Sequence, residues 1–136
     1  MTSDSDADRP ASRRVALAHL AGQAIDRTPG VTATTGPAGR WRTIGSQQTI
    51  PGVLAVEDGR GRVDIEVHLV VRWPPPMALE QLGEQFRGRL RRSAGTAGMG
   101  ERLGAVSVAF DDVEVGDVRV GDARVGDVQV DDAQVG

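Results

Sequence analysis

One stretch, residues 63–73, constrains the fold of this chain more than any other. Apolar side chains occupy every second position (Val63, Ile65, Val67, Leu69 and Val71), whereas charged or polar side chains fill most of the positions between them (Asp64, Glu66, His68 and Arg72). A period of two is typical of a β-strand with one dry and one wet face. Burying each apolar side chain contributes roughly 1.5–3 kcal/mol. Three prolines at 74–76 end the strand, because proline donates no ladder hydrogen bond.

The flanking patterns predict two helices and three further strands. Residues 12–27 form one helix, with Ser12 as its N-cap, and residues 78–93 form a second, with an apolar stripe at Leu79, Leu82, Phe86 and Leu90. Strands are expected at 31–35, at 49–57 with a break near Pro51-Gly52, and at 106–115. A turn at 58–61 joins the second strand to the strand at 63–73, and residues 36–48 form a long polar loop.

This order, α-β-β-β-α-β, predicts an α+β two-layer sandwich. Two amphipathic helices bury their apolar stripes most simply on one face of a mainly antiparallel sheet. Residues 12–115 form the predicted domain, after an acidic, disordered leader over residues 1–11.

A pentapeptide repeat fills the end of the chain from Asp112 onward, with units such as Asp-Val-Glu-Val-Gly and Asp-Val-Arg-Val-Gly. An odd period conflicts with the strand period of two unless each Gly-Asp step makes a turn. We expect residues 116–136 to be an acidic, disordered tail. Short strand-like pieces that extend the last strand are the main alternative. A calcium-binding repeat is disfavoured, because the glycine-rich nonapeptide of such proteins is not present.

Charge is segregated along the chain. Residues 9–110 carry fourteen arginines and eight acids, a balance of +6, whereas the two ends are acidic. All sixteen basic residues are arginine, which indicates a GC-rich, actinobacterial type of genome. The chain has no cysteine, no apolar run long enough to span a membrane and no signal-peptide pattern at its acidic start. We therefore expect a soluble, cytoplasmic protein.

The sequence offers no catalytic constellation. Asp64, Glu66 and His68 share one strand face, but neighbours two apart on a strand are about 6.5–7 Å apart. A metal ion would need further ligands from an adjacent strand, where none is evident, so these three side chains are predicted to form a solvated face. No serine lies in a Gly-x-Ser-x-Gly elbow, and no phosphate-binding loop is present. We expect no enzyme activity, no cofactor, no metal and no small-molecule substrate.

A nucleic-acid-binding module is the alternative function. Residues 95–98, Gly-Thr-Ala-Gly, match the GxxG loop with which KH domains clamp a nucleic-acid backbone, and they follow an arginine-rich helix. A KH domain needs a second helix directly after this loop, whereas here the last strand follows within a few residues. The helix arginines also spread around its circumference, so nucleic-acid binding is disfavoured.

The order of elements and several local phrases together resemble the alkaline shock protein family. The phrases are residues 15–25, Thr28-Pro29-Gly30-Val31, Ile50-Pro51-Gly52-Val53, the strand at 63–71, residues 79–90, and Leu103-Gly104-Ala105-Val106-Ser107-Val108. The resemblance covers residues 13–115. It implies a non-enzymatic envelope stress response protein of Gram-positive bacteria, which self-associates and is held at the inner membrane face by a small membrane-protein partner. The proline-rich strand end and the pentapeptide tail depart from the family pattern.

Two groups of residues are candidate protein contacts. One group is the polar face and end of the strand at 63–73, with His68, Val70, Arg72 and Trp73. The other is the loop segment Arg40-Trp41-Arg42. Tryptophan and arginine are enriched where binding energy concentrates at interfaces. Partial burial of each tryptophan against its own domain is the competing interpretation.

Overall fold

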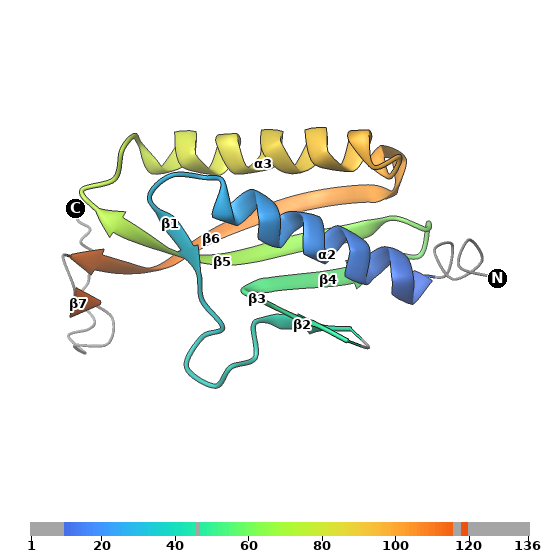
Figure 1. The fold of residues 1–136 in the computed structure, drawn as a ribbon, viewed down its shortest axis with the longest axis horizontal. Coiled ribbons are helices and arrows are strands. Elements are labelled where there is room, and N and C mark those ends of the chain that lie inside the picture. The colour runs from blue at the N-terminus through green and yellow to red at the C-terminus, as the bar shows by residue number, and fades with distance from the viewer. Residues whose placement is uncertain (1–9, 46, 116–117, 120–136) are drawn as a thin grey trace.

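The computed structural model describes residues 10–45, 47–115 and 118–119, and it has the predicted α+β architecture (Figure 1). The helices are α2 (Pro10–Asp26) and α3 (Leu79–Thr96), with a 3-10 turn η1 (Gly100–Arg102) after α3. The strands are β1 (Val31–Ala33), β2 (Arg42–Ile44), β3 (Thr49–Pro51), β4 (Val53–Glu57), β5 (Val63–Trp73), β6 (Leu103–Val115) and β7 (Val118–Arg119). The bounds of β5 match the predicted strand.

β5 is the centre of the main sheet. β6 pairs with one edge of β5 in parallel, and β7 pairs antiparallel with the end of β6. β1 and β4 share the other edge, both antiparallel to β5: β1 pairs with its last part and β4 with its first part. The parallel β5–β6 pair needs a crossover connection, and α3 is that crossover. The other strand pairs are antiparallel, which agrees with the predicted sheet.

Both helices pack on one face of the sheet, as predicted. The dry face of β5 is buried against them, from Val63 through Val71. α3 contributes Leu82, Phe86 and Leu90 of its predicted stripe, while Leu79, at the start of the helix, is partly exposed. Figure 1 shows α3 running along β6 and α2 crossing the sheet beside it.

Local chemistry explains where the helices begin and end. α2 begins at Pro10, two residues before the predicted N-cap, because proline is well suited to the first turn of a helix. At its other end the Thr28 hydroxyl donates to the Ala24 carbonyl at 2.8 Å, and Gly30 adopts a left-handed φ of 81°. At the start of α3, the Ala78 amide donates to the Gln81 side chain at 3.1 Å.

The predicted polar loop is a folded excursion over residues 34–52, which contains a small antiparallel hairpin of β2 and β3. The hairpin packs against α2: Ile50 is buried in the main core, and its Cγ2 lies close to Gly22. The predicted break near Pro51-Gly52 is confirmed, since Gly52 has a φ of 75° and separates β3 from β4. The prediction of a loop throughout residues 36–48 was therefore wrong at β2, where the buried Thr43 hydroxyl donates to the Val53 carbonyl at 2.7 Å.

The first four residues of the repeat, 112–115, belong to β6, which continues to Val115. β7, in the second pentapeptide, folds back so that Val118 pairs with Val115 and Arg119 with Glu114. This short strand lies inside the segment predicted to be a disordered tail and fits the alternative of strand-like pieces. The rest of the predicted tail, and residues 1–9 of the predicted leader, lie outside the described residues.

Candidate functional site

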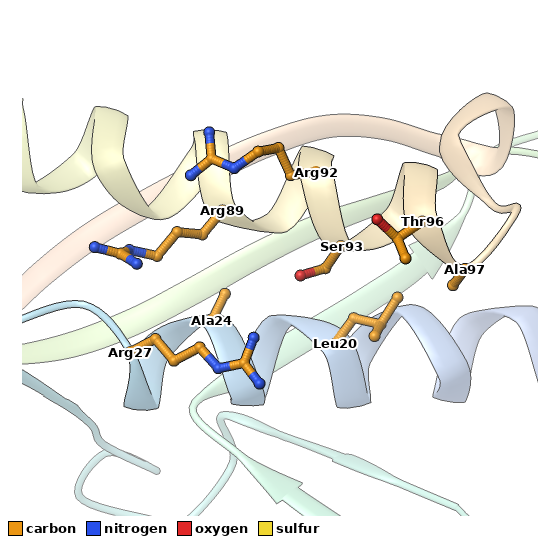
Figure 2. Close-up of a pocket in the computed structure, with 8 residues that line it drawn as sticks. All are labelled: Leu20, Ala24, Arg27, Arg89, Arg92, Ser93, Thr96 and Ala97. Atoms are coloured by element: carbon orange, nitrogen blue, oxygen red, sulfur yellow. The ribbon is translucent and has the colours of Figure 1, made fainter.

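A groove lies between the two helices near the end of α3 (Figure 2). It has a volume of about 430 Å³ and is lined by Leu20 and Ala24 of α2, by Arg27 directly after α2, by Arg89, Arg92, Ser93 and Thr96 of α3, and by Ala97. Figure 2 shows Arg27 and Arg89 reaching from facing helices, with the Ser93 hydroxyl between the two helices. Sequence reasoning missed this groove, because Arg27 and the α3 arginines lie more than sixty positions apart and only the packing of α2 on α3 brings them together.

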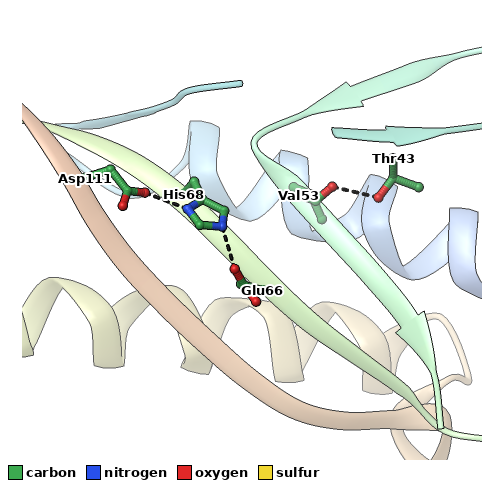
Figure 3. A network of polar contacts seen from close by, with 5 residues as sticks. All are labelled: Thr43, Val53, Glu66, His68 and Asp111. Carbon is green, nitrogen blue, oxygen red and sulfur yellow. Dashed lines mark hydrogen bonds and ion pairs between the residues drawn. The ribbon is translucent and has the colours of Figure 1, made fainter. Parts of the chain in front are cut away.

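A second polar cluster surrounds His68 on the face of β5 opposite the helices (Figure 3). The prediction of a solvated face was wrong at this residue: His68 is only 6% exposed. The indole of Trp41 covers the imidazole in a parallel stack, with ring centroids 3.9 Å apart and planes 8° apart. Asp64, Glu66 and Arg72 remain exposed, so the wet face of β5 is interrupted at His68 and Val70.

Both ring nitrogens of His68 contact carboxylates. Nδ1 lies 2.6 Å from Oδ2 of Asp111, and Nε2 lies 2.6 Å from Oε2 of Glu66 (Figure 3). A neutral imidazole has one donor and one acceptor, whereas an ionised carboxylate only accepts. A ring with a hydrogen on both nitrogens would donate to both carboxylates at once. With both nitrogens occupied, the ring has none left to activate a nucleophile. We call His68, Glu66 and Asp111 the His68 clamp.

A β-bulge places Asp111 beside His68. Leu69 pairs with Phe110 but Val70 pairs with Asp112, so Asp111 is the extra residue on β6. The sequence carries a signal of this bulge. The apolar positions Val106, Val108 and Phe110 are even-numbered, whereas Val113 and Val115 are odd-numbered. The change from even-numbered to odd-numbered apolar positions indicates one extra residue in the strand between positions 110 and 113.

The main chain of His68 also holds the two ends of the 34–52 excursion. The main chain of His68 donates to the Gly52 carbonyl at 2.8 Å, and its carbonyl accepts from the Thr34 amide at 2.9 Å. Gly36, with a φ of 80°, lies directly against the Trp41 indole, and a Cβ there would come within 2.7 Å of Cε3. Only glycine fits this approach without displacing the ring that stacks on His68.

The metal hypothesis gains no support. The sequence suggested no partner carboxylate on the strand next to His68, and that interpretation was wrong, because Asp111 of β6 is one. Across residues 10–45, 47–115 and 118–119, however, no group of three or more histidine, cysteine or acidic side chains has the arrangement needed to hold a metal ion. Asp111 and Glu66 bind the two sides of one imidazole instead.

The structure separates the predicted contact residues into two sets. His68 and Val70 are buried and Trp41 is half-buried, so these three do not form an open surface. The predicted role of His68 and Val70 as surface contacts was therefore wrong, because residue alternation does not reveal which part of a sheet face another segment covers. The exposed set is Arg40 and Arg42 beside β2, and Arg72 and Trp73 at the end of β5.

The predicted GxxG segment lies at the end of α3. Residues 95 and 96 are the last of the helix, and η1 and β6 follow, so no second helix begins after residue 98. This is not the helix–GxxG–helix arrangement by which KH domains hold a nucleic-acid backbone.

No protein-family model, curated protein or solved structure matches this chain. The resemblance to the alkaline shock protein family therefore stays a prediction. Among the helices that the structure describes, none is long and apolar enough to cross a membrane.

Proposed function

We propose that this chain is a non-enzymatic scaffold or adaptor that binds other proteins through the end of its sheet where β5 and β6 finish together. The observation that carries the proposal is a pair of exposed apolar side chains. Trp73 is 51% exposed and Val115 is 46% exposed, and these two residues are register partners on adjacent strands. We call Trp73 and Val115 the apolar pair. Tryptophan is among the residues most often found at the energetic centre of an interface.

Charged side chains border the apolar pair. Arg72 and Glu114 are the preceding register partners, and their side chains lie 3.8 Å apart. An apolar centre with a polar rim is the usual anatomy of a protein–protein interface. Arg40 and Arg42, also exposed, provide a second contact candidate on the 34–52 excursion. The occupation of both His68 nitrogens by carboxylates supports a role without catalysis.

The cellular role rests on the resemblance to the alkaline shock protein family. By that likeness the chain acts in the envelope stress response, in the cytoplasm at the inner membrane face, where a small membrane-protein partner holds it. The same likeness implies self-association, and a second copy of the chain is the first partner proposed for the apolar pair.

Light scattering combined with size exclusion, over a range of protein concentrations, tests self-association. We expect the mean mass to rise with concentration, and Trp73→Ala to weaken association about tenfold or more, the effect of a central interface residue. Val56→Ala is the matched control, since Val56 is 62% exposed on β4, away from the apolar pair. Equal weakening by both variants, or a strict monomer throughout, would remove self-association from the proposal.

A photo-crosslinking side chain at position 73 tests for the membrane-protein partner in cells. We expect crosslinks to a small membrane protein from position 73 and none from position 56. The same crosslinks from both positions would show that the contact does not use the apolar pair.

The alternative function is a small nucleic-acid-binding module that uses the arginine-rich body. Its support is the set of α3 arginines with no carboxylate partner among the described residues, such as Arg91 and Arg92. Binding of RNA or DNA would then fall steeply with salt, because phosphate contacts release counterions. A binding assay without salt dependence, or without binding, would remove this alternative.

A further inference from the structure

The groove between α2 and α3 concentrates positive charge that the protein does not neutralise. Arg27, Arg89 and Arg92 all line it. Within the part of the chain that the structure describes, no carboxylate lies within ion-pairing distance of any of the three. Some arginines elsewhere are paired, such as Arg13 with Glu57 and Arg87 with Glu84. Three like charges around one hollow repel each other, and an anion would relieve that repulsion.

The donors of the groove come from both walls. Arg27 approaches from the end of α2 and Arg89 from α3 (Figure 2). The hydroxyls of Ser93 and Thr96 add two more donors, and residues three apart share one helix face. The guanidinium group is planar and presents paired N–H donors that match the oxygens of a phosphate group.

One donor already lacks an acceptor. The Nε of Arg89 is out of contact with solvent and forms no hydrogen bond within the described residues. Among the described residues, its side chain forms one hydrogen bond, a long one from Nη2 to Oε1 of Gln85 at 3.5 Å. A buried donor without an acceptor is costly, so Arg89 would gain from a rearrangement of its side chain that brings Nε to an anion oxygen.

The rest of the lining is apolar. Leu20, Ala24 and Ala97 form this part of the groove, where water competes less for the arginines than on an open surface. A volume of about 430 Å³ lies within the range of small-ligand sites. The groove therefore suits a ligand with one strongly anionic group and a small apolar part.

We propose that this groove binds a small phosphate monoester, whose phosphate group contacts Arg27 and Arg89 and whose organic part rests on Leu20 and Ala97. Three cationic side chains match a phosphate dianion better than a single carboxylate, and the hydroxyls of Ser93 and Thr96 supply donors for its remaining oxygens. This inference uses residues distant from the apolar pair. It therefore stands or fails independently of the proposed scaffold function.

Isothermal titration calorimetry of the full chain tests the proposal, with inorganic phosphate and phenyl phosphate as probes at constant ionic strength. We expect a single class of saturable sites for both probes, with tighter binding of phenyl phosphate because its ring covers the apolar lining. Arg27→Gln and Arg89→Gln should each weaken binding about tenfold, the effect of losing one charge-assisted contact. Arg91→Gln is the control, because it removes the same charge from the same helix outside the groove.

Several results would overturn the proposal. One is the absence of saturable binding by either probe. Another is equal weakening by Arg27→Gln and Arg91→Gln, which would indicate general attraction to a basic body. A third is tight binding of a single-stranded RNA that Arg27→Gln abolishes while neither phosphate probe binds, which would assign the groove to nucleic acid. Arg27 is exposed, so its variant keeps the test valid even if Arg89→Gln unfolds the chain.

Discussion

The His68 clamp and the helix groove both gather charged side chains from several elements, but they treat charge in opposite ways. In the clamp, one imidazole lies between two carboxylates, and every polar atom of the ring has a partner. In the groove, three arginines meet around a hollow with no carboxylate partner among the described residues. Charged side chains that are paired within the chain stabilise the fold, whereas charged side chains without a partner are available to bind a ligand. Substitutions in the clamp should therefore lower the free energy of unfolding more than substitutions in the groove do.

The largest effect is expected from breaking the clamp with His68→Ala. This change removes the stack on Trp41 and leaves the carboxylates of Glu66 and Asp111 facing each other. We expect a loss of about 2–4 kcal/mol in the free energy of unfolding, measured by urea titration. His19→Ala, at an exposed position of α2, is the control and should stay within about 0.5 kcal/mol of the parent. Equal losses in both variants would contradict the clamp.

A smaller loss is expected from Gly36→Ala, which leaves every polar contact of the clamp in place. The added Cβ would press on the Trp41 ring at a backbone conformation that disfavours side chains. We expect a loss of about 1–3 kcal/mol in thermal unfolding. Trp41 fluorescence, read in a Trp73→Phe background, should also shift. Gly59→Ala is the control, since nothing lies within 4 Å of its added Cβ; a similar loss there would show that Trp41 packing is not the cause.

Two arginine substitutions compare paired with unpaired charge directly. Arg13 Nη2 lies 3.2 Å from Oε2 of Glu57, and the two side chains are only 12% and 29% exposed. Arg13→Gln should destabilise the chain by about 1 kcal/mol. Arg92→Gln, measured without phosphate, should change stability by less than about 0.5 kcal/mol. If chemical unfolding shows equal losses of stability in the two variants, the groove arginines stabilise the fold, and the groove does not differ from the clamp in this respect.

The smallest effect is expected at Asp58, whose carboxylate accepts hydrogen bonds from backbone amides. The amides of Arg60 and Arg62 donate to Asp58, and these hydrogen bonds lower the pKa of that carboxyl group below its ordinary value of 3.8. The resulting stability is fully present above pH 3.8 and is lost as the pH falls through the lower pKa of the folded state. Asp58→Asn should therefore show a shallower loss of stability in acid, measured by thermal unfolding from neutral pH downward. An unchanged acid profile would contradict this contribution.

Local patterns predicted much of the fold. The alternation of residues 63–73 gave β5 its bounds, Gly52 marked a real break, and the stripe through Leu82, Phe86 and Leu90 placed α3 on the sheet. Each of these features depends on residues close in sequence, so its period is visible without a structure. The turn at 58–61 follows the same rule, since the Asp58 carboxylate accepts hydrogen bonds from the nearby amides of Arg60 and Arg62.

The two polar sites depend on contacts distant in sequence. His68 and Asp111 are 43 positions apart, and they meet only because β6 pairs with β5 through a bulge. Trp41 reaches His68 because the excursion returns to β5 at Gly52. A strand's alternation reports which side chains share a face, but it carries no information on which parts of that face another segment covers. For that reason His68 and Val70 were predicted to be open to solvent.

β1 and β4 lie end to end along the same edge of β5. Ala33 pairs with Leu69 and Val53 pairs with Val67, with only His68 between them. The main-chain atoms of Thr34 and Gly52 both bond to His68, so the excursion leaves and re-enters the edge at one place. Residues 35–51 therefore leave and rejoin one strand edge, as an insertion into a continuous edge strand would. A chain that joins Thr34 to Gly52 directly would keep both main-chain partners of His68 on this edge, but it would lose Ile50 from the core and Trp41 from the stack on His68.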